Sequence, residues 1–276
     1  MRCEERPLVS VIMGICYRRP DLYFLERAIN SILRQSYRKL EFLICEDGSH
    51  SEAKERIKRF AAEDARIQLV DGAGAETLTV KLNRCITAAK GLYLARMDDD
   101  DFSLPDRLEK QLEYLRNHPE TAFAGCCALL EQDGTPAGVR RLPEFPTVRD
   151  FLFVQPFIHP ALLFRRQALE AAGGYCEEPR CIGCEDYDLL LRLYELGHTG
   201  ANIQEPLLRY TLPAKGKHGR TMGLRVKEMQ TRFIRFKSLG LLPKNIFYVI
   251  KPVAVGLLPA GVLERLKVWR RERGGN

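Results

Sequence analysis

Apolar and polar positions follow two different periods in the first part of the chain. Short apolar runs rich in β-branched residues predict strands at residues 8–13, 40–45, 67–70 and 92–97. Between them, helical patterns predict helices at residues 22–33, 52–62 and 77–89. Alternating strands and helices are typical of a parallel sheet covered by helices. We therefore predict an α/β fold.

The patterns after residue 101 are shorter. Leu108, Leu112 and Leu115 form the apolar stripe of a helix, and Ser103 is expected to cap it with Pro105 in the first turn. Two more strands are predicted at residues 122–130 and 161–164, and a hairpin turn at residues 132–135. Two more helices are predicted at residues 147–154 and 187–196.

The last part of the chain differs in charge. Residues 215–276 carry 15 Lys/Arg and 3 Asp/Glu, a net charge of +12, so residues 1–214 carry a net charge of −5. We expect one domain at residues 1–214 and a basic, partly apolar helical tail at residues 215–276. A basic tail of this kind contacts anionic lipid, nucleic acid or neither.

An apolar stretch at residues 245–263 follows a basic helix predicted at residues 221–239. A membrane-spanning helix needs about 20 uninterrupted apolar residues, but Lys251, Pro252 and Pro259 interrupt this stretch. We therefore favour a segment that lies in the membrane interface. The alternative is a helix packed on the domain.

Length and composition are those of a globular protein. The 276 residues suit one large domain, with or without a small appendage, and a hydrophobic content of 45% is enough for a sizeable core. Residues 1–7 lack the basic and apolar regions of a secretory signal. We therefore expect a cytoplasmic protein whose nine cysteines are reduced.

Four consecutive aspartates, Asp98 to Asp101, follow a predicted strand. Two carboxylates about 4 Å apart repel by roughly 4 kcal/mol at an effective dielectric near 20, so the run is either a solvated loop or a cation site. Ligands of such sheets bind at the carboxyl ends of the strands, where Glu46 and Asp47 also lie. This position favours a site for Mg²⁺ or Mn²⁺, which prefer oxygen ligands.

Two further acidic positions have an ordinary and a functional interpretation. Asp47 is either a turn residue or an acceptor for a base N–H or a ribose hydroxyl of a nucleotide. Glu185 and Asp186 lie just before a predicted helix, where acids are favoured by the helix dipole. The functional alternative is a general base that takes a proton from an attacking hydroxyl.

Histidines and cysteines give weaker signals. His159 lies between apolar residues and is more typical of a hydrogen-bonded core residue, whereas His218 lies in a basic segment within reach of a metal or a diphosphate. Three cysteines suggest zinc by their spacing but lack a clear fourth ligand. They are Cys176, Cys181 and Cys184.

Taken together and in this order, these segments resemble family 2 glycosyltransferases, which have the Rossmann-like GT-A fold. The opening strand, Val9–Ile15, resembles the first strand of the family. Three motifs carry the rest: Cys45–Ser49 resembles the DDGS turn, Ala95–Asp101 resembles ARMDADD with its DXD metal motif, and Ala172–Tyr175 followed by Glu185–Leu189 resembles GGY…EDYDL. The resemblance covers roughly residues 7–210. It implies a mixed, mostly parallel sheet flanked by helices.

The resemblance also implies an activity, which is inverting transfer of one sugar from a nucleotide-sugar, with a UDP-sugar the commoner donor among relatives. Asp186 would be the base, with Glu185 beside it. Asp100 and Asp98 would bind Mn²⁺ or Mg²⁺, and His218 is a further candidate ligand. The implied nucleotide contacts are Ile15, Tyr17, Asp47, Asn83, Asp98 and Asp99.

The tail from about residue 241 resembles that of bacterial surface-polysaccharide transferases. It implies peripheral binding at the inner face of the cell membrane, a lipid-linked or saccharide acceptor, and no nucleic-acid partner. Two alternatives stay open. One is a nucleotidyltransferase or metal-dependent phosphohydrolase that uses the same aspartates, and the other is a nucleic-acid binder that uses the basic tail.

Overall fold

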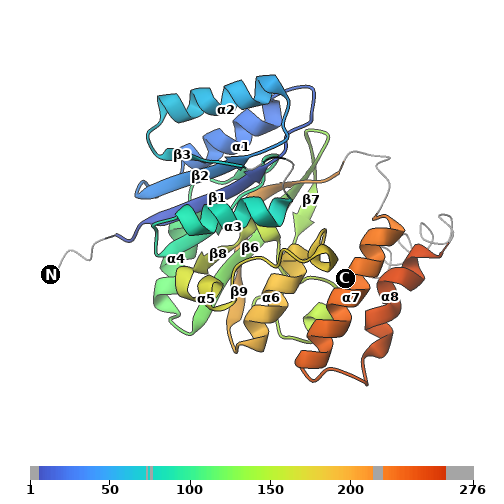
Figure 1. The fold of residues 1–276 in the computed structure, drawn as a ribbon. Coiled ribbons are helices and arrows are strands. Elements are labelled where there is room, and N and C mark those ends of the chain that lie inside the picture. Colours follow the sequence, from blue (N-terminus) through green and yellow to red (C-terminus); the bar gives the residue numbers. More distant parts are fainter. Residues whose placement is uncertain (1–5, 73, 75–76, 214–219, 259–276) are drawn as a thin grey trace.

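The computed structural model describes residues 6–72, 74, 77–213 and 220–258. Their centre is a sheet with the strand order β3-β2-β1-β4-β8-β6-β9-β5, in which β7 also pairs with β6 (Figure 1). The strands are β1 Val9–Ile15, β2 Leu40–Glu46, β3 Ile67–Val70, β4 Tyr93–Arg96, β5 Phe102–Ser103, β6 Thr121–Gln132, β7 Thr135–Arg140, β8 Leu163–Arg165 and β9 Thr199–Thr211.

The sheet is mixed, as predicted. Strands β1, β2, β3, β4, β6 and β9 run in one direction, and β5, β7 and β8 run in the other. The first four strands are parallel because each returns through a helix. The helices are α1 Tyr23–Leu33, α2 Ser51–Glu63, α3 Leu78–Ala88, α4 Arg107–Asn117, α5 Arg166–Ala171, α6 Glu185–Glu195, α7 Met222–Ser238 and α8 Ile246–Gly256, with single 3₁₀ turns η1 Asp150–Leu152, η2 His159–Ala161 and η3 Pro179–Cys181.

Strand β1 is buried on both faces because its residues alternate between two hydrophobic clusters. Val11 and Met13 belong to one cluster with apolar residues of α1, α2 and α4. Ile12 belongs to the other cluster with residues of α3, α5 and α6. A strand covered on both faces needs apolar side chains at successive positions, which explains the unbroken apolar runs of the sequence.

The carboxyl ends of β1, β2 and β4 lie at one edge of the sheet. The N–H of Asp47 donates to the carbonyl of Ile15 at 3.1 Å, and the N–H of Met97 donates to the carbonyl of Ile12 at 3.2 Å. The segments that follow β2 and β4 therefore begin on either side of β1. Both predicted acidic segments start at this edge.

The predicted cap at Ser103 is wrong. Ser103 lies in β5, its N–H donates to Ser31 Oγ at 3.1 Å, and its own hydroxyl accepts from Gln35 at 3.0 Å. Helix α4 begins only at Arg107, after an N-cap at Asp106. Local propensity favours Ser103 as a helix cap, but the pairing of β5 with β9 places it in a strand instead.

The hairpin turn at residues 132–135 is confirmed and joins β6 to β7. Its two central residues, Asp133 and Gly134, have φ angles of 50° and 78°, as a two-residue hairpin loop requires. No strand is predicted at β9, since Asn202, Gln204, Glu205 and Pro206 interrupt any apolar pattern. That strand is instead held by its long pairing with β6.

The described part of the C-terminal region packs on the domain. Helix α7 lies against α6, with Thr231 and Phe236 buried, and α8 lies beside α7 with Val249 and Pro252 buried (Figure 1). Among the described residues, no helix has the length and apolar content needed to cross a membrane. Residues 259–263 of the apolar stretch lie outside the described residues.

Candidate active site

The aspartates that follow β4 are each held by a different partner. Arg96 Nη2 lies 2.5 Å from Asp98 Oδ1, and Arg19 Nη2 donates to Asp100 Oδ2 at 2.6 Å. The carboxylate of Asp101 is buried and accepts from the N–H of Thr211 at 2.8 Å. These contacts fix the run at the end of the strand, so it is not a freely solvated acidic loop.

Burial and neighbouring negative charge raise the pKa values of three of these aspartates. Burial, and then the charges of Asp98 and Asp100, raise the pKa of Asp99 to about 7. Burial and the charge of Asp98 also raise the pKa of Asp100, and the pKa of Asp101 is raised well above its usual value. The nearby arginines therefore offset only part of the negative charge.

The second acidic pair lies at the start of α6. The side-chain amide of Gln155 donates to Asp186 Oδ2 at 2.7 Å, and the N–H of Tyr187 donates to Asp186 Oδ1 at 2.7 Å. Glu185 Oε2 accepts from the N–H of Gly183 at 2.6 Å. Burial, and then the charge of Asp186, raise the pKa of Glu185.

One cleft of about 510 Å³ brings the two acidic groups together. Its lining includes Asp98 from the end of β4 and both Glu185 and Asp186 from α6. Neither Asp47 nor Asp100 is part of this lining. A largely basic wall comes from β7, α7, α8 and the segment before α7, through Arg140, Arg220, Arg225, Arg232 and Lys251. Glu228 of α7 also lies in this wall and pairs with Arg220 and Arg232.

Beside the cleft, a buried lysine ties the ends of β1 and β2 together. Lys81 Nζ donates to the carbonyls of Ile15 at 2.7 Å and Asp47 at 2.5 Å. A Cβ at Gly72 would lie 2.9 Å from Asp47 Cβ, so only glycine leaves room for that aspartate. The arrangement holds Ile15 and Asp47 rigidly at the edge of the sheet. Lys81 has no predicted role from sequence.

Tyr17 and Asn83, two of the predicted nucleotide contacts, also lie outside the lining of the cleft. The ring of Tyr17 is buried and its hydroxyl donates to the carbonyl of Asp21 at 2.9 Å, so in this arrangement it secures its loop. Asn83 holds the backbone of Tyr175 by two hydrogen bonds of 2.8 Å and positions that segment. His218 lies outside the described residues.

His159 is a hydrogen-bonded core residue, as its apolar surroundings predict. Its Nε2 lies 2.7 Å from the hydroxyl of Tyr175, and burial lowers its pKa well below the usual value. It also lines the cleft, beside Arg96 and Gln155. Sequence reasoning missed the roles of Arg96 and Gln155, because nothing in their local sequence shows that they are directed at the two acidic groups.

The three cysteines do not converge. Cys184 Sγ lies 3.4 Å from the hydroxyl of Thr231. Cys176 and Cys181 instead lie together near Asp188, with their ligand atoms within 4.8 Å of one another. No three-cysteine zinc site is formed by this part of the described chain.

Residues 10–173, which include both acidic strand ends, match the model of the family described as glycosyl transferase family 2. The chain belongs to glycosyltransferase family 2. It is 33% identical over 262 residues to EpsE of Bacillus subtilis (strain 168). The alignment covers 94% of this chain and 92% of EpsE. The family match ends before Glu185 and Asp186, so it does not bear on their roles.

Two further relatives carry more specific names. The amylovoran biosynthesis glycosyltransferase AmsE of Erwinia amylovora is 27% identical, over 97% of this chain and 100% of AmsE. The O-antigen biosynthesis glycosyltransferase WbnJ of Escherichia coli is 33% identical, over 75% of this chain and 81% of WbnJ. This family 2 member is therefore similar to its relatives over most of their length.

Solved structures confirm the predicted GT-A fold. The mannosyltransferase PcManGT of Pyrobaculum calidifontis, solved in complex with GDP-Man and Mn²⁺, has a TM-score of 0.63 at 18% identity, over 96% of this chain and 80% of that one. S. aureus TarS has a TM-score of 0.61 at 12% identity, over 90% of this chain and 42% of that one. At these identities the likeness concerns the fold of the family 2 domain alone.

Proposed function

We propose that this family 2 glycosyltransferase moves one sugar from a nucleotide-sugar to an acceptor hydroxyl, with inversion at the anomeric carbon. The observation that carries the proposal is the common cleft of Asp98 and Asp186, which lie far apart in sequence. A donor held near Asp98 and an acceptor held near Asp186 meet in that cleft. The basic wall of the same cleft suits the negative charge of a diphosphate or of an acidic acceptor.

The carboxylates after β4 fit a divalent cation. Burial, and then the charges of neighbouring aspartates, raise the pKa values of Asp99 and Asp100, and Asp101 Oδ2 is buried without a hydrogen-bond partner among the described residues. Asp100 and Asp98 would hold Mn²⁺ or Mg²⁺, with oxygen ligands that suit either ion. When bound, the ion neutralises charge on a leaving diphosphate.

The nucleotide would bind along the adjoining edge of the sheet. Asp47 is half-buried at the end of β2, and its backbone is fixed by Ile15 and Lys81. A carboxylate held in this way accepts hydrogen bonds from base or ribose groups without reorganising. The donor nucleoside is proposed to be uridine. Guanosine is the other donor nucleoside to test, because PcManGT was solved with GDP-Man.

Asp186 would act as the base. Both of its oxygens are hydrogen-bonded, one to the Gln155 side chain and one to its own helix backbone, so the carboxylate is oriented before an acceptor arrives. It would take the proton of the acceptor hydroxyl as the oxygen attacks the anomeric carbon. Glu185 beside it, which lines the same cleft, would contact the acceptor.

The acceptor is proposed to be a lipid-linked or other saccharide in surface polysaccharide synthesis, as the names of AmsE and WbnJ indicate for those proteins. Helix α8 supports docking at an anionic inner leaflet, because it exposes apolar side chains beside the basic wall of the cleft. These exposed residues are Ile246, Phe247 and Ile250. They would place the cleft close to a membrane-bound acceptor.

The test is a thermal-shift screen of nucleoside diphosphates and their sugars, with and without Mn²⁺, followed by product analysis. The proposal predicts stabilisation that needs both the nucleotide and the metal, and release of a nucleoside diphosphate. Release of pyrophosphate or inorganic phosphate would favour a nucleotidyltransferase or phosphohydrolase. Binding of DNA that weakens steeply with salt, without metal-dependent nucleotide binding, would contradict sugar transfer.

A further inference from the structure

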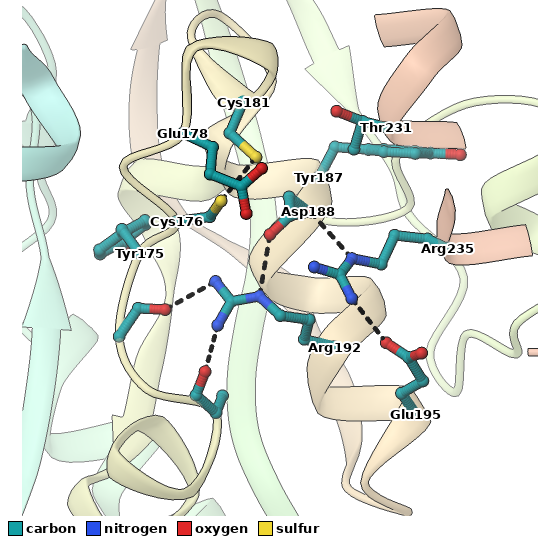
Figure 2. A network of polar contacts seen from close by, with 12 residues as sticks. Tyr175, Cys176, Glu178, Cys181, Tyr187, Asp188, Arg192, Glu195, Thr231 and Arg235 are labelled. Carbon is teal, nitrogen blue, oxygen red and sulfur yellow. Dashed lines mark hydrogen bonds and ion pairs between the residues drawn. The ribbon is translucent and has the colours of Figure 1, made fainter. Parts of the chain in front are cut away.

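Two thiols lie in contact beside the loop that leads into α6. Cys181 Sγ is 2.9 Å from Cys176 Sγ (Figure 2). Cys176 precedes the single turn η3, and Cys181 is its last residue. Cys176 is half-buried and Cys181 is buried. Sugar transfer as proposed above uses neither of them.

The third group near these thiols is not free to bind a metal. Asp188 Oδ1 accepts from Arg235 at 2.8 Å, and Asp188 Oδ2 accepts from Arg192 at 2.8 Å (Figure 2). Asp188 Oδ1 also accepts from Arg180 at 3.3 Å. Three guanidinium groups around one carboxylate also repel a cation. A structural zinc site is usually closed by four ligands, and the described residues supply no fourth His, Cys, Asp or Glu to this group.

The two thiols differ in accessibility. Cys176 lies in an open surface depression, and its Sγ is 3.8 Å from Nη2 of Arg180. Cys181 is enclosed, and burial followed by its contact with Cys176 raises its pKa. Cys176 is thus the residue that an external reagent meets first, and Cys181 is placed to react second.

We propose that Cys176 and Cys181 are a thiol–disulfide couple that a low-molecular-weight disulfide oxidises. The Cys176 thiolate attacks one sulfur of that disulfide, which forms a mixed disulfide and releases one thiolate. Cys181 then loses its proton and attacks Cys176 Sγ, which forms the Cys176–Cys181 bond and releases the second thiol. The two protein thiols lose two electrons and two protons, and the external disulfide becomes two thiols.

The position of the couple gives the bond a structural consequence. The segment from Cys176 to Cys184 joins Tyr175, which contacts His159, to Glu185 and Asp186. The carbonyl of Arg180 in this segment accepts from Thr231, and the N–H of Gly183 binds Glu185. A covalent link across η3 would restrict the loop that precedes the acidic pair.

The test uses the full-length protein, reduced, desalted and incubated with oxidised glutathione before free thiols are alkylated. Trypsin cleaves after Arg180, which separates the two cysteines, so a bond between them appears as two linked peptides. We expect that linked pair, with two fewer alkylated thiols than in the reduced protein. Absence of the linked pair while other cysteines react would overturn the proposal.

Variants separate the two steps. Cys181→Ser should stop at a glutathione adduct on Cys176, and Cys176→Ser should give neither adduct nor linked peptides at this site. Cys184→Ser is the matched control, because the thiol of Cys184 faces Thr231. This variant should still form the Cys176–Cys181 bond. Equal glutathione uptake at position 176 by wild type and Cys181→Ser, or stoichiometric zinc held by the two thiols, would overturn the proposal.

Discussion

The side-chain amide of Gln155 donates a 2.7 Å hydrogen bond to Asp186 Oδ2. Gln155 lies between η1 and η2, whereas Asp186 begins α6, so this contact joins two walls of the cleft. The N–H of Tyr187 holds the other oxygen of Asp186. Loss of the Gln155 contact would leave the carboxylate tethered only to its own helix.

Gln155→Leu should therefore lower kcat with little change in the KM for the donor. Misplacing a reacting group by about 1 Å costs up to about 100-fold in rate, so a loss of about 10- to 100-fold is expected. Steady-state release of nucleoside diphosphate measures it. Gln132→Leu, which removes a surface amide outside the cleft, is the control. Unchanged kcat in Gln155→Leu would show that this contact does not position the base.

Glu185→Gln should raise the stability of the fold at neutral and alkaline pH. Burial raises the pKa of Glu185 in the folded state, so the fold is stabilised where the group is protonated and loses that stability as pH rises through the folded pKa. Glutamine keeps the acceptor for the N–H of Gly183 and carries no charge. The difference in Tm between variant and wild type should grow from acid to alkaline pH. A difference that is constant across pH would contradict this account of the carboxyl.

Asp188→Asn should destabilise the protein by about 3–5 kcal/mol at neutral pH, the usual cost of breaking a buried ion pair. Asp188 is fully buried, and although burial opposes its charge, Arg235 and Arg192 lower its pKa. The lost stability is present at neutral pH and disappears as pH falls through the folded pKa. Urea unfolding at two pH values measures it.

Glu195→Gln is the matched control for Asp188→Asn. It removes a more exposed partner of Arg235, and a loss of about 1 kcal/mol or less is expected. Equal effects of the two substitutions would mean that Asp188 is not the centre of the network in Figure 2.

Phe247→Ser combined with Ile250→Ser should weaken binding to anionic phospholipid vesicles about tenfold or more, since burying one large apolar side chain contributes about 1.5–3 kcal/mol. Both side chains are exposed, at 68% and 48%, whereas Val249 between them is buried. Donor hydrolysis should be unaffected. Leu92→Ser, at an exposed leucine near the amino end of β4, is the control. Vesicle binding that does not change would rule out α8 as the membrane contact.

The strands and helices of the first part could be predicted because local pattern and tertiary structure agree there. Val11, Ile12 and Met13 are all apolar since both faces of β1 are covered. The alternation of elements also predicts which edge carries Asp47 and Asp98. Because these strands are buried on both faces, the sequence predicts both the fold and the edge of the sheet where Asp47 and Asp98 lie.

The remaining features depend on contacts between distant segments. Strand β9 is held by its pairing with β6 in spite of its polar residues, and Ser103 joins β5 because β9 is present. Asn83, which the resemblance places among the nucleotide contacts, holds Tyr175, which is 92 residues away. No local pattern contains these pairings, and the same holds for Gln155 with Asp186.

The most direct test compares wild type with Asp186→Asn after equal donor binding has been verified by calorimetry in the presence of Mn²⁺. The quantity measured is the rate of nucleoside diphosphate release at saturating donor. Asp100→Ala is the variant that should lose metal-dependent binding. Glu178→Gln, at an exposed acidic residue, is the control. A base that takes the acceptor proton predicts a loss of about 10²- to 10⁴-fold in Asp186→Asn with donor affinity unchanged. Full metal-dependent binding by Asp100→Ala would contradict the assignment of the metal to that residue. Release at a near-normal rate by Asp186→Asn would contradict the shared cleft as the site of sugar transfer.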